Sequence, residues 1–250
     1  PPPPPPPPPP PFSSRRRHTR CNRWSRGLGD VYKRQPYYNS MGMLTEQAFQ
    51  DLLHNMPPLE MFEQKFGYER RAGQAPHDRY SLEYAPGMEV PQPWQEFIGE
   101  LCSDDYRREV ERLLGARKAE FRFHWHYTPN GADVSPHCDA RREHGSHLFY
   151  FNSEDDWNPD WGGSTLVLDD GGRLDYNSAP DYEDFDDIIE CESIGNYSSL
   201  MLRTDHAWHA VRPIDCPEDK LRRIFIVVVN PDNLFWKVRD RIIGKTIYRF

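Results

Sequence analysis

The sequence predicts a mainly β fold, a jelly-roll of short strands with flanking N-terminal helices. Two observations carry this prediction. In the middle of the chain the apolar residues first recur every three to four residues, and from Ala119 onward they recur every second residue. After this change, short apolar runs alternate with clusters of Gly, Pro, Asn and Asp, which is typical of many strands joined by turns.

Three segments before the change in period have helical spacing. The first covers residues 43–56 and is stopped by Pro57, and the second begins near Pro93. The third begins after Ser103, a good N-cap because its hydroxyl can accept a hydrogen bond from the first turn, and it closes at Gly115. We expect these helices to pack against one face of a sheet.

The first strand of the sheet is predicted at residues 119–127, AEFRFHWHY. Its aromatic residues alternate with charged and polar ones, so one face of the strand is expected to be buried. His124 and His126 lie on the other face and are expected to be substrate-side or surface residues rather than metal ligands. Further strands are predicted around residues 134–139, 146–152, 164–168, 198–203 and 222–230.

The chain divides into three parts on these criteria: residues 1–35, a helical region over 36–118 and a β core over 119–250. The first part starts with eleven prolines and continues as a basic stretch without helical or strand period. It resembles a translated sequencing adapter, so we expect it to be disordered and to take no part in the fold. A basic arm that binds nucleic acid or a membrane is the alternative.

The formal net charge of −8 hides an uneven distribution. Outside the basic stretch, the chain holds 23 of its 31 basic side chains and 38 of its 39 acidic ones. Such an acidic domain repels a phosphate backbone, so no nucleic-acid partner is expected, and a neutral or basic substrate is favoured. The most acidic segment, 181–192, is expected to be a solvated loop, with a lid or docking surface for a basic substrate as the alternative.

Other classes of protein are disfavoured by what the sequence lacks. No apolar run approaches the roughly 18–20 residues of a membrane span, so no membrane partner is expected. The five cysteines are odd in number and form no CxxC pair, which argues against a disulfide framework and a thiolate zinc site. A reducing, cytoplasmic setting is therefore expected. Nothing in the sequence indicates the oligomeric state.

The segment SPHCDARR carries the clearest chemical signal. In an extended strand, His137 and Asp139 point to the same face, and Cys138 points away. An imidazole and a carboxylate are two thirds of the facial triad of non-haem iron(II) oxygenases, which leaves coordination positions open. The third ligand has to come from a distant strand, and His209 is well placed for this.

An HxD pair alone is weak evidence, but further motifs follow it in a fixed order. The set resembles the prolyl 4-hydroxylase-like branch of the 2-oxoglutarate/iron(II) oxygenases over about residues 119–230. The motifs are Tyr127 and Gly131, His137 with Asp139, FYFN at 149–152, Trp157 or Trp161, Gly162-Gly163, HAVRP at 209–213, and a basic residue that opens an apolar strand.

The resemblance implies a double-stranded β-helix, the cupin-like form of the jelly-roll, and an iron(II)- and 2-oxoglutarate-dependent dioxygenase. It implies that His137, Asp139 and His209 are the catalytic residues that bind iron. His206 is a competing candidate, but the distal histidine of the family is followed by x-Val, as His209 is. Oxygen would be the co-substrate and ascorbate the reductant.

The resemblance also implies a site for 2-oxoglutarate. Arg222 matches the arginine that pairs with the distal carboxylate of the cosubstrate, and Arg223 is the second candidate. A planar guanidinium suits this role because it makes two parallel bonds to a carboxylate. Ile224 stands where the family usually has serine or threonine. Tyr127 and Tyr150 match aromatic positions that line the cosubstrate pocket, with core packing as the alternative.

The implied reaction is hydroxylation of an unactivated C–H bond in a small molecule or a peptidyl residue, proline among the candidates, with conversion of 2-oxoglutarate to succinate. The carboxylate of Asp139 argues against halogenation, which would need room for halide. Two alternatives are a non-catalytic jelly-roll that binds metal or acts as a sensor, and a cupin-type iron enzyme that does not use 2-oxoglutarate. A zinc hydrolase is disfavoured because no HExxH is present.

Overall fold

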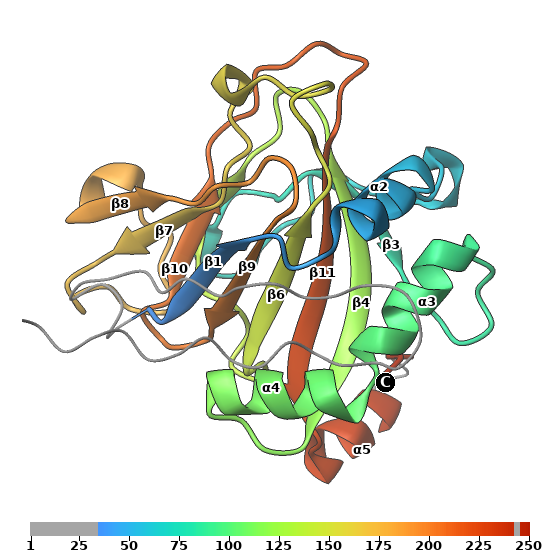
Figure 1. The fold of residues 1–250 in the computed structure, drawn as a ribbon. Helices are drawn as coiled ribbons and strands as arrows, with labels where there is room; N and C mark the ends of the chain where they lie inside the picture. Colours follow the sequence, from blue (N-terminus) through green and yellow to red (C-terminus); the bar gives the residue numbers. More distant parts are fainter. Residues whose placement is uncertain (1–34, 243–245) are drawn as a thin grey trace, which may run out of the picture.

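The computed structural model describes residues 35–242 and 246–250, and it contains two antiparallel sheets that face each other (Figure 1). The mainly β jelly-roll predicted from the sequence is confirmed. The expectations for residues 1–34 lie outside the described residues. Gln35, which closes the segment expected to be disordered, is buried, and its side chain donates a hydrogen bond to the carbonyl oxygen of Leu168. This residue therefore belongs to the fold.

The larger sheet has seven strands in the order β1-β9-β6-β11-β4-β3-β2. Its centre is the pair β4 (Ala119–Thr128) and β11 (Arg222–Pro231), which match residue for residue over their whole length. The other strands are β1 (Tyr37–Met41), β2 (Glu63–Lys65), β3 (Arg79–Glu83), β6 (Gly145–Tyr150) and β9 (Tyr197–Leu202).

The smaller sheet has four strands in the order β5-β10-β7-β8. In β10 the Cα atom of His209 lies opposite that of His137 in β5 and that of Val167 in β7. The sheet therefore aligns two histidines that are 72 positions apart in the sequence. Its strands are β5 (Val134–His137), β7 (Leu166–Asp169), β8 (Asp187–Glu190) and β10 (Trp208–Val211).

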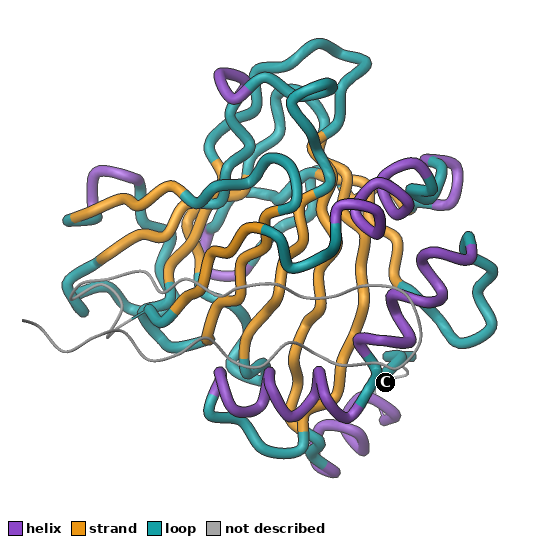
Figure 2. Tube along the Cα trace, in the orientation of Figure 1, coloured by secondary structure: helices purple, strands orange, loops and turns teal. Residues whose placement is uncertain are grey.

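Three helices cover the outer face of the larger sheet, as predicted (Figures 1 and 2). Helix α2 (Glu46–His54) begins after Thr45, whose hydroxyl accepts a hydrogen bond from the Ala48 amide at 3.2 Å. Helix α3 spans Gln92–Leu101. Helix α4 (Asp104–Leu114) has the predicted cap at Ser103 and ends at Gly115, whose φ of 62° suits glycine.

The core between these helices and the sheet is aromatic. Trp94 of α3 is fully buried, and its ring centre lies 5.1 Å from Trp125, 5.0 Å from Phe225 and 5.1 Å from Phe151. The aromatic residues that alternate along β4 all enter this core. Burying an aromatic side chain stabilises a fold by about 1.5–3 kcal/mol, so this layer anchors the large sheet.

Several elements differ from the sequence-based prediction. The region 36–118 is not only helical, because it supplies β1 to one edge of the large sheet and β2 and β3 to the other. Part of the acidic segment forms β8, an edge strand paired with β7, rather than a loop. These short strands have little apolar alternation of their own and are held by their neighbours. Helix α5 (Leu234–Ile242) also follows β11.

The remaining helical segments are short 3-10 turns at Leu59–Met61, Arg71–Gly73, Pro159–Trp161 and Tyr182–Asp184. None of the helices in the described part of the chain has the length and apolar character that a bilayer crossing requires.

Candidate functional site

A cavity of about 720 Å³ lies between the two sheets. On the large sheet it is lined by the face of β4 and β11 that points away from the helices. One wall is polar and comes from β2, β3 and β4, and the other is apolar and comes mainly from β11 and β6. On the small sheet it is bounded by β5 and β10, which bring His137 and His209 to it.

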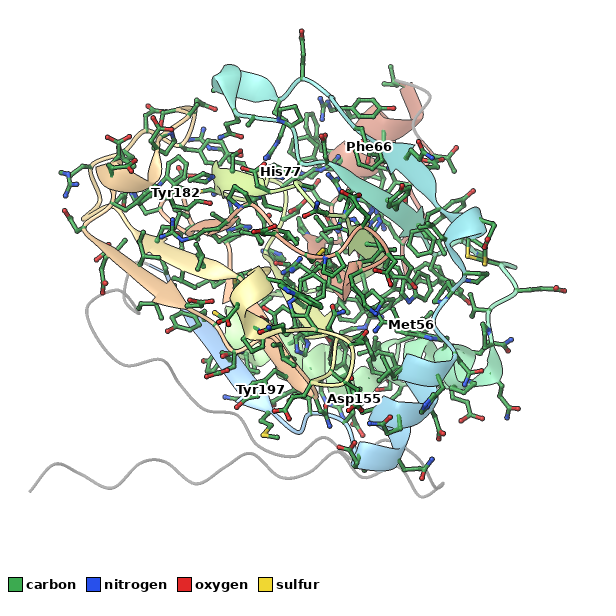
Figure 3. All side chains as sticks on the ribbon, turned by 90° about the horizontal axis from the view of Figure 1, so that it is seen from above. Met56, Phe66, His77, Asp155, Tyr182 and Tyr197 are labelled. Carbon is green, nitrogen blue, oxygen red and sulfur yellow. The ribbon has the colours of Figure 1, made fainter. Side chains whose placement is uncertain are left out.

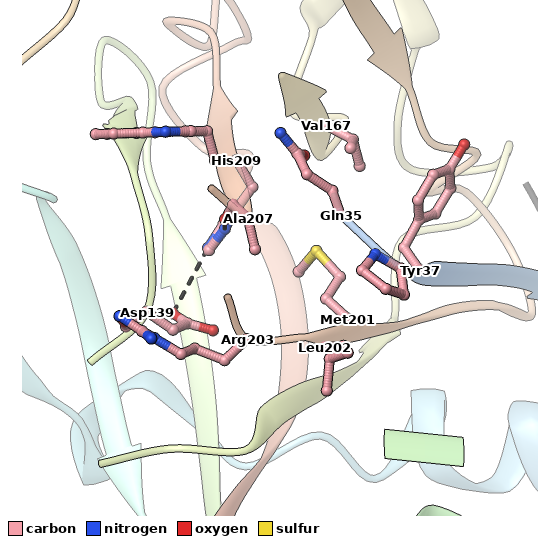
Figure 4. Close-up of a pocket in the computed structure, with 11 residues that line it drawn as sticks. Gln35, Tyr37, Asp139, Val167, Met201, Leu202, Arg203, Ala207 and His209 are labelled. Atoms are coloured by element: carbon pink, nitrogen blue, oxygen red, sulfur yellow. Dashed lines mark hydrogen bonds and ion pairs between the residues drawn. The ribbon is translucent and has the colours of Figure 1, made fainter. Parts of the chain in front are cut away.

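His137, Asp139 and His209 meet in this cavity. One side-chain donor atom from each residue lies within 4.8 Å of the others, so the group could hold a metal ion. The imidazole centres of the two histidines are 4.2 Å apart, and Nε2 of His209 lies 3.6 Å from Oδ1 of Asp139 (Figure 4). Two ring nitrogens and a carboxylate match the donor set that non-haem iron(II) sites use.

Backbone carbonyls hold both imidazoles in place. Nδ1 of His137 donates to the carbonyl oxygen of Ser135 at 2.9 Å, and Nδ1 of His209 donates to that of Ala207 at 3.1 Å. Each ring therefore keeps its Nε2 free of these backbone bonds, and a hydrogen bond from Nδ1 to a carbonyl is the arrangement found behind metal-bound histidines. The second oxygen of Asp139 accepts a hydrogen bond from Ser146 at 3.3 Å.

Burial keeps the imidazole of His137 in the form that binds metal. Desolvation lowers the pKa of His137 well below its usual value, and the neighbouring His209, His77 and Arg70 lower it further. A neutral imidazole has a lone pair to offer at pH 7, so a metal ion would not compete with a proton there.

The loop that carries Asp139 is fixed from its main chain. The carbonyl oxygen of Asp139 accepts hydrogen bonds from the Tyr176 hydroxyl at 3.2 Å and from Nε of Arg203 at 3.1 Å. Cys138 points away from the cavity centre into a cluster with Trp208, and burial raises the pKa of its thiol. A small recess of about 10 Å³, lined in part by Tyr37, lies beside Asp139 and His209 (Figure 4).

His206, the competing candidate ligand, lies elsewhere. Its Nδ1 is 2.8 Å from Oδ2 of Asp170, a fully buried carboxylate in the turn after β7. Hydrogen bonds from His206 and from the amides of Gly172 and Leu174 outweigh burial and lower the pKa of Asp170. The structure thus brings His209, and not His206, to His137 and Asp139.

Arg222 is buried at the far side of the cavity, with 5% of its surface exposed. Its Nε donates to the carbonyl oxygen of Gly163, and Nη2 lies 3.3 Å from the hydroxyl of Thr165. Burial lowers the pKa of Arg222 to about 10, so the guanidinium is still charged at pH 7. Gly163 has φ +88°, and a Cβ there would lie 3.1 Å from Cδ of Arg222, so only glycine suits this position.

The neighbouring Arg223 points to the opposite face of β11. Its guanidinium forms an ion pair with Asp156, and its main-chain N–H donates to Oδ1 of Asn152 at 2.7 Å. The pleat of the strand separates the two arginines because successive side chains alternate between faces. Ile224 and Ile226 share the cavity face with Arg222, as their spacing indicated.

The two tyrosines expected near the cosubstrate are placed differently. The hydroxyl oxygen of Tyr150 lies within hydrogen-bonding distance of the hydroxyls of Thr165, at 2.9 Å, and Ser199, at 3.0 Å, and its ring lies 6.0 Å from the Arg222 guanidinium. Tyr150 therefore supports the wall behind the cavity. Tyr127 does not reach the cavity. Its hydroxyl donates to the Pro57 carbonyl at 2.8 Å, because it shares the helix-covered face of β4.

His124 and His126 do line the cavity, on the polar face of β4. Their ring centres are 5.9 Å apart, and the pKa of each is lowered, first by burial and then by nearby cations such as Arg79. Two residues were missed from the sequence. His77 has its ring 4.5 Å from that of His137, and Arg79 opens β3.

His77 belongs to the segment between β2 and β3. Figure 3 shows it between Phe66, next to the edge of the large sheet, and Tyr182, next to the edge of the small sheet. Its pKa is lowered to about 2, mainly by burial and then by Arg70 and Arg79. The only sequence signal for this region was the short alternation in RYSLE, which is too brief to distinguish a strand from a loop.

Comparisons with known proteins bear on this geometry. No protein-family model matches the sequence, and no curated protein matches it. The structure is similar to a prolyl 4-hydroxylase of Pseudomonas putida, with a TM-score of 0.57 and 16% identity over 82% of this chain and 97% of that chain. A prolyl hydroxylase of Trichoplax adhaerens, solved with a peptide fragment of hypoxia-inducible factor, has a TM-score of 0.57 and 13% identity over 87% and 90%.

A third similar structure is a non-haem, α-ketoglutarate-dependent carbocyclase from nogalamycin biosynthesis, with a TM-score of 0.50 and 14% identity over 82% of this chain and 84% of that chain. At these identities the likeness establishes the fold alone. The chain is thus built on the double-stranded β-helix of the prolyl 4-hydroxylases and other 2-oxoglutarate/iron(II) oxygenases, and a His-Asp-His group that could hold a metal ion faces its cavity.

Proposed function

We propose that this protein is an iron(II)- and 2-oxoglutarate-dependent dioxygenase that hydroxylates an unactivated C–H bond. The observation that carries the proposal is the pairing of two features in one cavity. A His-Asp-His group lies on one sheet, and a buried arginine lies on the other sheet. A non-catalytic metal-binding jelly-roll would have no use for that arginine, since an unpaired buried charge costs free energy.

The proposed roles follow from the placement of each side chain. His137, Asp139 and His209 would hold iron(II). When bound with 2-oxoglutarate, the metal supplies the chemistry by which oxygen is split, one atom going to the substrate as hydroxyl and the other to succinate, with release of carbon dioxide. Arg222 would bind the distal carboxylate of 2-oxoglutarate and so orient the molecule toward the three ligands.

The surroundings fit a dicarboxylate between Arg222 and the ligands. Thr165, which contacts Arg222, can turn its hydroxyl toward a carboxylate, and Tyr150 fixes Thr165 from behind. Ile224 stands next to Arg222 on the cavity face and excludes water from this end of the cavity. Because Ile224 offers no hydroxyl, Arg222 and Thr165 would carry the recognition of the distal carboxylate.

The substrate is proposed to be a small molecule or a peptidyl residue. The peptide bound to the Trichoplax prolyl hydroxylase supports a peptide, and the carbocyclase from nogalamycin biosynthesis supports a small molecule on the same fold.

The test is succinate formation from 2-oxoglutarate by the full chain with iron(II), oxygen and ascorbate, first without any other substrate. We expect slow turnover in the wild type. His137→Ala should abolish it because the metal loses a ligand, and Arg222→Met should weaken it because the cosubstrate loses its anchor. Arg223→Met is the matched control: it removes an adjacent arginine whose partner, Asp156, lies outside the cavity.

Each result separates one alternative from the proposal. Turnover that survives Arg222→Met but not His137→Ala would indicate an iron enzyme that binds 2-oxoglutarate elsewhere or does not use it. No turnover in the wild type, together with no binding of 2-oxoglutarate, would leave a metal-binding module without oxygenase activity.

A further inference from the structure

Two arginines in the cavity have no acidic partner. Among residues 35–242 and 246–250, neither Arg222 nor Arg79 forms an ion pair with a carboxylate, whereas Arg122 in the same cavity bonds to Glu83 at 3.0 Å. A desolvated guanidinium without a counter-charge costs free energy, so an anion is the natural occupant of such a site. Arg222 is assigned above to 2-oxoglutarate, which leaves Arg79.

Arg79 is fixed toward the cavity with hydrogen-bonding capacity to spare. Nη1 donates to the carbonyl oxygen of His77 at 2.7 Å, and Nε is buried without a hydrogen-bond partner in the described part of the chain. Burial lowers the pKa of Arg79, and Asp78 is the acidic neighbour that offsets this shift. A guanidinium has five N–H groups, so most of them are available to a ligand.

The neighbours of Arg79 reinforce its charge. Lys65 of β2 lies opposite Arg79 in the strand register, and both line the cavity, while Lys65 also forms an ion pair with Glu63 at 3.5 Å. Burial lowers the pKa of His77 and of His126, and the charge of Arg79 lowers both further. This wall lies on the β3 side of the cavity, two strands away from Arg222 on β11, with β4 between them.

Five acidic residues line the cavity, namely Glu69, Asp78, Glu83, Asp139 and Glu143, and two of them are engaged by other groups. Glu83 is bonded to Arg122, and Asp139 belongs to the proposed metal group. Asp78 accepts a hydrogen bond from the Gly67 amide at 2.7 Å. Burial, and after it the nearby Asp139, raises the pKa of Glu143.

We propose that Arg79, with Lys65 beside it, binds an anionic group of the substrate, a carboxylate or a phosphate. The inference rests on the proposed function, since it names the class of substrate for the same cavity. It places the anion on the β3 wall and the carbon to be oxidised between that wall and His137, Asp139 and His209. It also reverses the expectation from overall charge, which favoured a neutral or basic substrate, because the cavity wall is basic where the surface is acidic.

The test measures anion binding and needs neither turnover nor a known substrate. The full chain is loaded with iron(II) without oxygen, and its thermal midpoint is followed while inorganic phosphate or acetate is added. The variants are Arg79→Met, Arg79→Lys and Arg222→Met. Arg108→Met, an exposed arginine on α4, is the control for non-specific binding.

We expect phosphate or acetate to raise the midpoint of the wild type. Arg79→Met should weaken the apparent affinity about tenfold, a difference of about 1.4 kcal/mol. Arg79→Lys should weaken it less, since it keeps the charge but not the paired N–H groups. A stronger response to phosphate than to acetate would identify a phosphorylated substrate, and the reverse would identify a carboxylic acid. In Arg222→Met, phosphate or acetate should still raise the midpoint, because the anion can still bind at Arg79.

The same variants separate failure of this inference from failure of the proposed function. Equal anion responses in the wild type and Arg79→Met, or no response in the wild type, would overturn the inference. Loss of 2-oxoglutarate binding in Arg79→Met but not in Arg222→Met would also overturn it, because Arg79 would then be the cosubstrate residue. Absence of 2-oxoglutarate binding in every protein would instead contradict the proposed function.

Discussion

The two faces of the large sheet are built from the same strands, but one packs against the helices and the other lines the cavity. Toward the helices, β4 and β11 present Phe121, Trp125 and Phe225, which pack with Trp94 into a closed aromatic layer. Toward the small sheet, the alternate residues of these strands line a cavity with His126 and Arg222 among them. One face therefore stabilises the fold, and the other carries the buried Arg222, which forms no ion pair with a carboxylate in the described part of the chain.

The largest effect is expected from a substitution in the aromatic layer on the outer face of the large sheet. Trp94→Ala removes the fully buried ring at the centre of the aromatic layer and should lower the free energy of unfolding by about 3–5 kcal/mol. Chemical denaturation measures this. Metal affinity at a temperature where the variant is folded should stay unchanged. A large loss of metal affinity in the folded variant would show that the two faces are not independent.

A substitution in the metal group is expected to lower metal affinity. His209→Ala should lower iron(II) affinity by more than about 100-fold, beyond the effect usual for residues behind the ligands, because a direct donor is lost. The matched control is His206→Ala, three residues away and bonded to Asp170. Equilibrium competition with a chelator measures both. Equal losses in the two variants would contradict the ligand assignment.

A smaller effect is expected at the two glycines before β7. At Gly163, where φ is +88°, the Cβ of an alanine would press against Cδ of Arg222. At Gly162, where φ is +76°, the nearest atom to such a Cβ would be the carbonyl oxygen of Pro213, at 3.6 Å. Both alanine variants should lose about 1–3 kcal/mol of stability through backbone strain. Only Gly163→Ala should also weaken 2-oxoglutarate binding, measured by titration calorimetry. Equal 2-oxoglutarate affinities of the two variants would argue against the idea that the position of the Arg222 side chain controls 2-oxoglutarate binding.

The last effect concerns pH and the outer face, and it is small near neutral pH. His147 is fully buried there, with Nδ1 2.9 Å from the Tyr106 hydroxyl, and burial lowers its pKa from 6.5 to about 3. The unfolded chain takes up this proton first as the pH falls. The stability from neutral His147 is therefore complete above pH 6.5 and is lost from there toward pH 3, by about 1.4 kcal/mol per pH unit.

His147→Gln should remove about one proton from the slope of unfolding free energy against pH between pH 6.5 and 5. Denaturation at several pH values measures the slope. A variant with the slope of the wild type would show that other histidines, such as His124, account for the acid sensitivity.

The sequence predicted the parts of the molecule that local patterns control. The caps Ser103 and Gly115 located α4, and the alternation in residues 119–127 located β4, because both signals act within a few residues. The predicted strand 134–139 ends early, at His137, and Asp139 reaches the same group from the loop that follows. The edge strands β1 to β3 were missed, since their pairing with β9 and β4 comes from distant parts of the chain.

The rest of the site depended on contacts that no local pattern reports. The surroundings of the two candidate arginines could not be predicted: Arg223 pairs with Asp156, and Arg222 lines the cavity. Tyr127 followed the alternation of its strand into the helical core and away from the cavity. The proposed role of Arg79 could not be predicted, because it rests on the absence of an ion pair between Arg79 and a carboxylate within residues 35–242 and 246–250.

We propose that one site for iron(II) and 2-oxoglutarate is formed by His137, Asp139, His209 and Arg222. The most direct measurement is the visible absorbance of the full chain with iron(II), without oxygen, as 2-oxoglutarate is added. A new charge-transfer band is expected in the wild type, absent in His209→Ala and needing at least about tenfold more 2-oxoglutarate in Arg222→Met. No band in the wild type, or a band of equal affinity in Arg222→Met, would contradict the claim.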